Sequence, residues 1–158
     1  MDAGAVVASF SSLLGMFEAL FSGLLRVHQA IYEATDGWIG HRLLGVPTLL
    51  LRTTGRKTGQ TRTAALVYAK DGESYIVVAS KGGADVSPGW FFNAEANPEV
   101  EVQLGRTRRT ATAEPIERGS QDYDRLWALT NQRNGNRYNQ YQRKTARPIP
   151  LLRLTPTP

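Results

Sequence analysis

The chain has 158 residues, contains no cysteine and only two histidines, and carries a formal net charge of +5. This length is typical of one domain around a single hydrophobic core. The absence of cysteine excludes disulfides and cysteine nucleophiles, and His28 and His41 are too isolated to indicate a metal site, so we expect no metal. This composition agrees with a cytoplasmic location.

The positive charge is unevenly distributed along the chain. No acidic residue occurs from Gly37 to Lys70, and none follows Asp124. Two basic regions of this kind indicate a partner that carries negative charge. The candidates are a phosphate-bearing cofactor, a nucleic acid and an anionic membrane.

Residues 1–36 form the first predicted unit. Apolar residues recur at steps of three and four from Phe10 to Ile31, which predicts an amphipathic helix over about 5–32. The opposite face is small and weakly polar, and its serines together with Glu18 argue against a transmembrane span. Two interpretations stay open. The helix packs on the core, or it contacts the inner face of the cell membrane peripherally.

Residues 37–158 form the second predicted unit, which begins with three extended runs at about 48–54, 60–69 and 74–80. Asp71-Gly72 is a strong hairpin signal between the last two runs. We then expect a short helix at about 88–96 and two strands at about 100–104 and 107–117. A helix capped by Ser120 follows from 120 onward, and a closing strand spans about 149–154.

Short connections between strands indicate an antiparallel sheet. About six such strands tend to curl into a small barrel with helices packed outside, so the predicted class is α+β. The segment 131–147 is rich in Asn, Gln and Arg and predicts no definite element.

Four cations lie beside glycine-bounded turns. Arg56 and Lys57 occupy the turn after the first strand, hairpin pairing brings Arg62 near them, and Lys81 follows the third strand. Arg and Lys in such a cluster suit phosphate and carboxylate oxygens, although cations in a turn can also simply face water. If the four cations converge, they form an anion site.

Two groups of aromatic residues could accompany that site. Trp90, Phe91 and Phe92 stand at a loop–helix junction, where they either join the core or form the wall for a flat ring. Tyr138 and Tyr141 are three residues apart and would share one face of a helix. Because their surroundings are polar, we expect both tyrosines to be partly exposed.

The motifs R-T-T-G-R-K-T-G-x-x-R-T, S-K-G-G-A and P-x-W-x-x-N occur in this order, and Y-x-x-Y-Q-x-K-T-x-R-x-I-P spans Tyr138 to Pro150. Together they resemble the deazaflavin-dependent nitroreductase family, whose members are coenzyme F420-dependent quinone reductases. The resemblance implies a split β-barrel with coenzyme F420 (8-hydroxy-5-deazaflavin) as cofactor. It also implies hydride transfer from the reduced cofactor to a quinone or nitroaromatic acceptor.

The resemblance further implies a set of cofactor contacts. Arg56, Lys57 and Thr58 would bind the phosphate and the polyglutamate tail. The remaining contacts would be Arg62, Thr63, Ala64, Ala65, Leu66, Val67, Val78, Ala79, Ser80, Lys81, Gly89, Trp90, Phe91, Phe92, Asn93 and Tyr138. Reduction of a quinone also needs a proton, for which Tyr138, Tyr141, Ser80 and water are the candidates.

Two other classes of protein remain. One is a split barrel that binds deazaflavin, flavin mononucleotide or haem without catalysis. The other is a nucleic-acid-binding barrel, which usually interleaves aromatic residues with its cations. No aromatic residue lies between Arg52 and Arg62, so we expect no nucleic acid partner.

Overall fold

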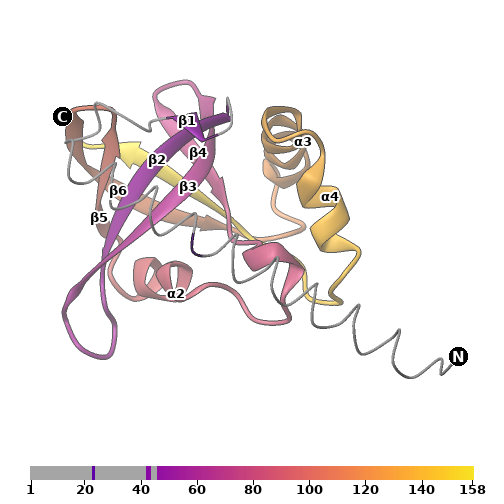
Figure 1. The fold of residues 1–158 in the computed structure, drawn as a ribbon, viewed down its shortest axis with the longest axis horizontal. Coiled ribbons are helices and arrows are strands. Elements are labelled where there is room, and N and C mark those ends of the chain that lie inside the picture. Colours follow the sequence, from indigo (N-terminus) through magenta and orange to yellow (C-terminus); the bar gives the residue numbers. More distant parts are fainter. Residues whose placement is uncertain (1–22, 24–41, 44–45) are drawn as a thin grey trace, which may run out of the picture.

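The computed structural model describes Gly23, residues 42–43 and residues 46–158 (Figure 1). Apart from Gly23, the helix predicted at 5–32 lies outside these residues, so its prediction is untested. The strands are β1 (Arg42–Leu43), β2 (Val46–Thr54), β3 (Thr61–Asp71), β4 (Ser74–Val78), β5 (Glu99–Leu104), β6 (Thr107–Ile116) and β7 (Leu151–Pro156). The helices are the 3-10 turn η1 (Lys81–Gly83), α2 (Gly89–Ala96), α3 (Tyr123–Arg133) and α4 (Arg137–Gln142).

The strands form one antiparallel sheet in the order β1-β2-β3-β4-β7-β6-β5. A further pairing between β2 and β5 closes β2 to β7 into a barrel. Leu51 shows the closure directly, because its partner is Ala64 of β3 on one side and Val102 of β5 on the other. The predicted antiparallel barrel is confirmed.

Alternation along the strands fills the barrel with apolar side chains. Leu49 and Leu51 of β2, Val77 of β4 and Leu152 of β7 are fully buried in this interior cluster. Helix α2 lies across one end of the barrel (Figure 1), and its Phe91 packs into the same cluster.

A second buried cluster lies outside the barrel, between the sheet and the pair α3–α4 (Figure 1). β4 belongs to both clusters, because Val77 points inward while Ile76 and Val78 belong to the outer cluster. The outer cluster also contains Leu126 of α3 and Tyr138 of α4. This packing holds α4 beside the end of β4.

Two local predictions need correction. Ser120 does not cap α3. Asp122 directly precedes the helix, and Ser120 forms an earlier turn in which its hydroxyl donates to the Glu117 carbonyl over 2.7 Å. The segment 131–147 contains α4, which the polar composition did not predict. Asn136 directly precedes α4 with a φ of 61°, a left-handed conformation that Asn tolerates better than most residues.

Candidate functional site

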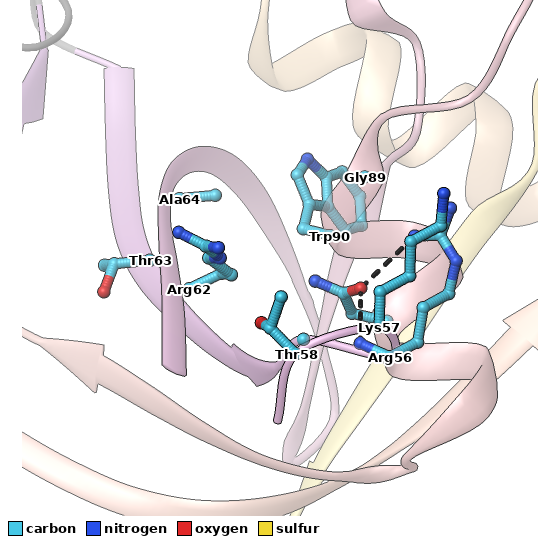
Figure 2. A pocket seen from close by; sticks show the side chains of 10 residues that line it. Arg56, Lys57, Thr58, Arg62, Thr63, Ala64, Gly89 and Trp90 are labelled. Atoms are coloured by element: carbon cyan, nitrogen blue, oxygen red, sulfur yellow. Dashed lines mark hydrogen bonds between the residues drawn. The ribbon is translucent and has the colours of Figure 1, made fainter. Parts of the chain in front are cut away.

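The turn between β2 and β3 borders a concavity of about 390 Å³, here called the turn hollow. Its lining consists of Gly55, Arg56, Lys57, Thr58, Arg62, Thr63, Ala64, Gly89, Trp90 and Asn93. Among these described residues three are cations and none is acidic. Figure 2 shows Arg62 and Ala64 of β3 across the hollow from Trp90 and Arg56. The hollow therefore presents positive charge to any group that enters it.

Asn93 of α2 fixes the conformation of this turn. Its side-chain Oδ1 accepts hydrogen bonds from the Arg56 backbone N–H at 3.2 Å and from Arg56 Nη1 at 3.3 Å. Its Nδ2 donates to Thr53 Oγ1 over 3.3 Å, and the Arg56 guanidinium lies 5.0 Å from the centre of the Phe92 ring. Asn93 and Phe92 of α2 thus orient the Arg56 side chain, which stays exposed to solvent.

Strand alternation decides which residues of β3 face the hollow. Arg62 and Ala64 are two residues apart and point to the same face. The Thr63 side chain points to the other side of the strand in Figure 2, although Thr63 also lines the hollow. Two backbone hydrogen bonds close the turn, from Gly55 N to Gln60 O at 2.8 Å and from Gly59 N to Gly55 O at 2.7 Å. Gly59 has a φ of 69°, which glycine adopts without strain.

A larger concavity of about 590 Å³, the tyrosine hollow, lies between β3, the end of β4, η1 and α4. Most of its lining is apolar. Its lining consists of Thr48, Ala65, Leu66, Val67, Val78, Ser80, Lys81, Gly82, Pro88, Trp90, Asn134, Arg137, Tyr138 and Tyr141. Trp90 lines both hollows, so the two hollows meet at this residue.

The four predicted cations do not converge on one point. Arg56, Lys57 and Arg62 line the turn hollow, but Lys81 lines the tyrosine hollow. Lys81 lies in η1 after β4 and not in the turn between β2 and β3. Because η1 contacts α4, Lys81 lies near the tyrosines of α4. Lys81 itself adopts a left-handed φ of 46°, a conformation that L-residues rarely take.

The expected exposure of Tyr138 is wrong. The residue is only 7% exposed, and its ring packs between Trp127, at 6.3 Å between ring centres, and Tyr141, at 6.2 Å. Burial raises the pKa of the Tyr138 hydroxyl to about 12, while a hydrogen bond with Asn134 opposes that shift. The group therefore keeps its proton at neutral pH. Tyr141 is half-buried, with Lys144 Nζ 5.6 Å from its ring centre.

Ala79, Phe91 and Phe92 are the predicted cofactor contacts that line neither hollow. Ala79 and Phe91 are buried in the barrel interior, and Phe92 packs against that cluster. The other predicted residues divide between the two hollows. Sequence reasoning did not single out Thr48, Asn134 or Arg137, which line the tyrosine hollow. Asn134 and Arg137 lie within four residues of Tyr138 in the chain, and this spacing is the one signal that could have indicated them as site residues.

Within residues 46–158 and the few others described, no group of His, Asp and Glu is arranged to hold a metal ion. In the same part of the chain, no helix has both the length and the apolar character needed to cross a membrane.

The closed antiparallel barrel with its paired hollows defines the class of protein, which is a cofactor-binding split β-barrel. A model of the F420H(2)-dependent quinone reductase family matches residues 24–156, and the chain belongs to this family. The F420H(2)-dependent quinone reductase Rv1261c of Mycobacterium tuberculosis is 54% identical over 133 residues, which cover 84% of this chain and 89% of that protein.

Solved structures agree with this assignment. The structure titled F420-H2 dependent reductase (FDR-A) has a TM-score of 0.62 and 37% identity, over 68% of this chain and 93% of that chain. HutZ, a haem storage protein from Vibrio cholerae, has a TM-score of 0.56 over 70% of this chain and 82% of that chain. Its identity is 20%, so this likeness shows the fold alone.

Family membership makes the chain an oxidoreductase with coenzyme F420 as its cofactor, as the motifs predicted. The residues present fit such a group. The turn hollow offers cations without acids to an anionic tail, and the tyrosine hollow offers an apolar cleft to a flat ring.

Proposed function

We propose that this protein transfers a hydride from reduced coenzyme F420 to a quinone, with the anionic tail in the turn hollow and the ring and acceptor in the tyrosine hollow. The observation that carries this proposal is the position of Trp90. Because this side chain lines both hollows, one elongated ligand can bind cations at one end and an apolar cleft at the other.

When bound, the reduced cofactor supplies the hydride, and the protein supplies binding, orientation and a proton. Arg56 and Arg62 hold negative charge through forked N–H donors, and Lys57 adds a point charge. Lys81 provides a cation at the tyrosine hollow. This arrangement fixes the ligand at both ends and so limits the positions that the ring can take.

A quinone becomes a hydroquinone by accepting one hydride and one proton. Tyr138, Tyr141 and Ser80 all line the tyrosine hollow, so their hydroxyls are the candidate proton donors. We favour Tyr138 because its buried ring is held between Trp127 and Tyr141. Burial raises the pKa of its hydroxyl to about 12, so it would act as a weak acid. A nitroaromatic acceptor stays a prediction, because the family name specifies a quinone.

The direct test is anaerobic mixing of the protein with reduced F420 and menadione. The visible absorbance of the oxidised cofactor should return at a rate proportional to protein concentration. A nitroaromatic in place of menadione tests the second acceptor. A protein that binds F420 tightly but leaves this rate at the background value would be a cofactor-binding barrel without catalysis.

Cofactor placement is tested separately by fluorescence titration of F420 into single variants. One hydrogen bond to a charged group contributes about 1.5–3 kcal/mol, so Arg62→Ala and Lys81→Ala should each weaken binding roughly 10- to 100-fold. Arg109→Ala is the matched control, since it removes one exposed arginine of β6 that lines neither hollow. Affinity equal to wild type in both site variants would rule out this placement.

A further inference from the structure

Arg147 lies between α4 and β7, and its guanidinium joins two stretches of the loop that follows β4. Its Nη2 donates to the carbonyls of Ala79 and Ser80, each at 3.0 Å. Its Nε donates to the Ala84 carbonyl over 2.7 Å, and its Nη1 donates to Ser87 Oγ over 3.1 Å. One side chain thus binds this loop on both sides of η1.

These bonds act on the backbone of Ser80 and Lys81. The Ser80 carbonyl accepts from Arg147 and also from the Gly83 N–H at 2.9 Å, which forms the turn of η1. The next residue, Lys81, has a φ of 46°, so its backbone must be held by its surroundings. Arg147 provides that restraint through a planar fork that lysine cannot reproduce.

Arg147 is in turn fixed to the segment after α4. Its backbone N–H donates to Thr145 Oγ1 over 3.2 Å, and its carbonyl accepts from Gln142 Nε2 at 2.8 Å. Thr145 Oγ1 also bonds Asp85 Oδ1 over 2.8 Å, which adds a second link to the loop. The guanidinium therefore sets how the end of α4 and the Ser80–Lys81 backbone lie relative to each other.

We infer that Arg147 is a positioning residue for the F420 site, which acts by holding Lys81 at the tyrosine hollow. This inference rests on the proposed function and adds to it a residue that lines neither hollow. It predicts that loss of the guanidinium fork weakens cofactor binding through Lys81, beyond any effect on the stability of the fold.

The test is a double-mutant cycle on the full chain with F420 titration as the readout. Arg147→Lys keeps the charge and removes the fork, and it should raise the Kd for F420 roughly 10-fold, because a displaced Lys81 loses part or all of the contact that Lys81→Ala removes. In the Lys81→Ala background the same change should raise the Kd less than about 2-fold, because coupled residues are not additive.

Arg153→Lys is the matched control. Arg153 is also an arginine of low exposure, and it pairs with Glu114 and Asp122 away from both hollows. Arg153→Lys should lower the melting temperature without changing the Kd. Ser87→Ala removes one acceptor of Arg147 and should raise the Kd about 2- to 10-fold, so the inference can be tested even if Arg147→Lys does not fold.

The variants distinguish failure of the role of Arg147 from failure of the proposed F420 placement. If Lys81→Ala binds F420 as wild type does, the cofactor placement fails and the role of Arg147 fails with it. If Lys81→Ala weakens binding while Arg147→Lys and Ser87→Ala do not, only the role of Arg147 is overturned. Equal effects of Arg147→Lys in both backgrounds would also overturn it, because a purely structural arginine does not act through Lys81.

Discussion

Tyr138 is buried although its neighbours in the chain are polar. Asn, Gln and Arg surround it in the chain, yet its ring is buried between Trp127 and Tyr141. Desolvation disfavours the charged phenolate, which is why the pKa rises from 10.0 to about 12. Burial thus fixes the position of the hydroxyl at the tyrosine hollow but makes it a weaker acid than an exposed tyrosine.

We predict that Tyr138→Phe lowers the turnover of menadione by roughly 10²–10⁴-fold, because proton transfer by a positioned side chain contributes about that much. The affinity for F420 should stay near that of wild type. With a pKa of about 12, the Tyr138 hydroxyl should leave the rate flat through moderately alkaline pH. Steady-state rates and F420 titration measure both effects.

Tyr138→Ala provides the comparison, because it removes the ring as well as the hydroxyl and should lower the melting temperature. If Tyr138→Phe turns over menadione at the wild-type rate, the proton comes from Tyr141, Ser80 or water instead.

At the scale of elements, the contact between α4 and η1 shapes the tyrosine hollow. Gly83 lies at this contact with a φ of 87°, and a Cβ added there would come within 2.6 Å of the Tyr141 carbonyl oxygen. Gly82 is the adjacent residue with a φ of 67°, but a Cβ added there meets no atom within 4 Å. A substitution at Gly82 measures the cost of backbone strain alone, whereas one at Gly83 adds the cost of a clash between η1 and α4.

Gly83→Ala should therefore destabilise the protein more than Gly82→Ala does. Strain in a left-handed backbone costs about 1–3 kcal/mol in either variant, and only Gly83→Ala also pushes α4 away from η1. Urea unfolding measures the difference. If both variants lose the same free energy of unfolding, α4 can shift away from η1 without destabilising the protein.

Helix α3 is tied to the β3–β4 hairpin by a forked ion pair. Arg125 Nη1 and Nη2 donate to Asp71 Oδ1 and Oδ2 at 2.8 and 3.0 Å. The hydrogen bond from Arg125 holds the pKa of Asp71 below its ordinary value of 3.8, although partial burial opposes the shift. The folded state thus favours the charged carboxylate more than the unfolded state does.

The stability that this pair contributes should be present above the ordinary Asp pKa and should be lost as the pH falls through the lowered pKa of Asp71. Asp71→Asn should be less stable than wild type at neutral pH, and the two should converge in strong acid. Urea unfolding across a pH series measures this convergence. A stability difference that stays constant to the lowest pH would show that the pair is not its source.

At the scale of the whole molecule, positive charge and an apolar N-terminal stripe occur in one chain. We predict that the segment 5–32 binds anionic membranes reversibly, because apolar burial and attraction of basic residues to anionic lipid add together. The full chain should float with anionic liposomes and a chain that starts at Asp36 should not. Equal flotation of the two would assign the segment a purely structural role.

The sequence by itself determined the features that depend on neighbours in the chain. Alternating residues and the Asp71-Gly72 turn predicted antiparallel strands, and the glycines around Arg56 and Lys57 predicted a tight cationic turn. The motifs that resemble the family also predicted the F420 cofactor, which family membership confirms. These features are local because hydrophobic periodicity and turn chemistry act over a few residues.

Only the tertiary structure decided the features that join distant segments. The β2–β5 pairing closes the barrel, and packing of α4 against Trp127 buries Tyr138 in spite of its polar neighbours. The tertiary fold also places Lys81 at a different hollow from Arg56 and brings Arg147 to the loop after β4. Such contacts depend on long-range burial and hydrogen bonding, for which neither composition nor periodicity carries a signal.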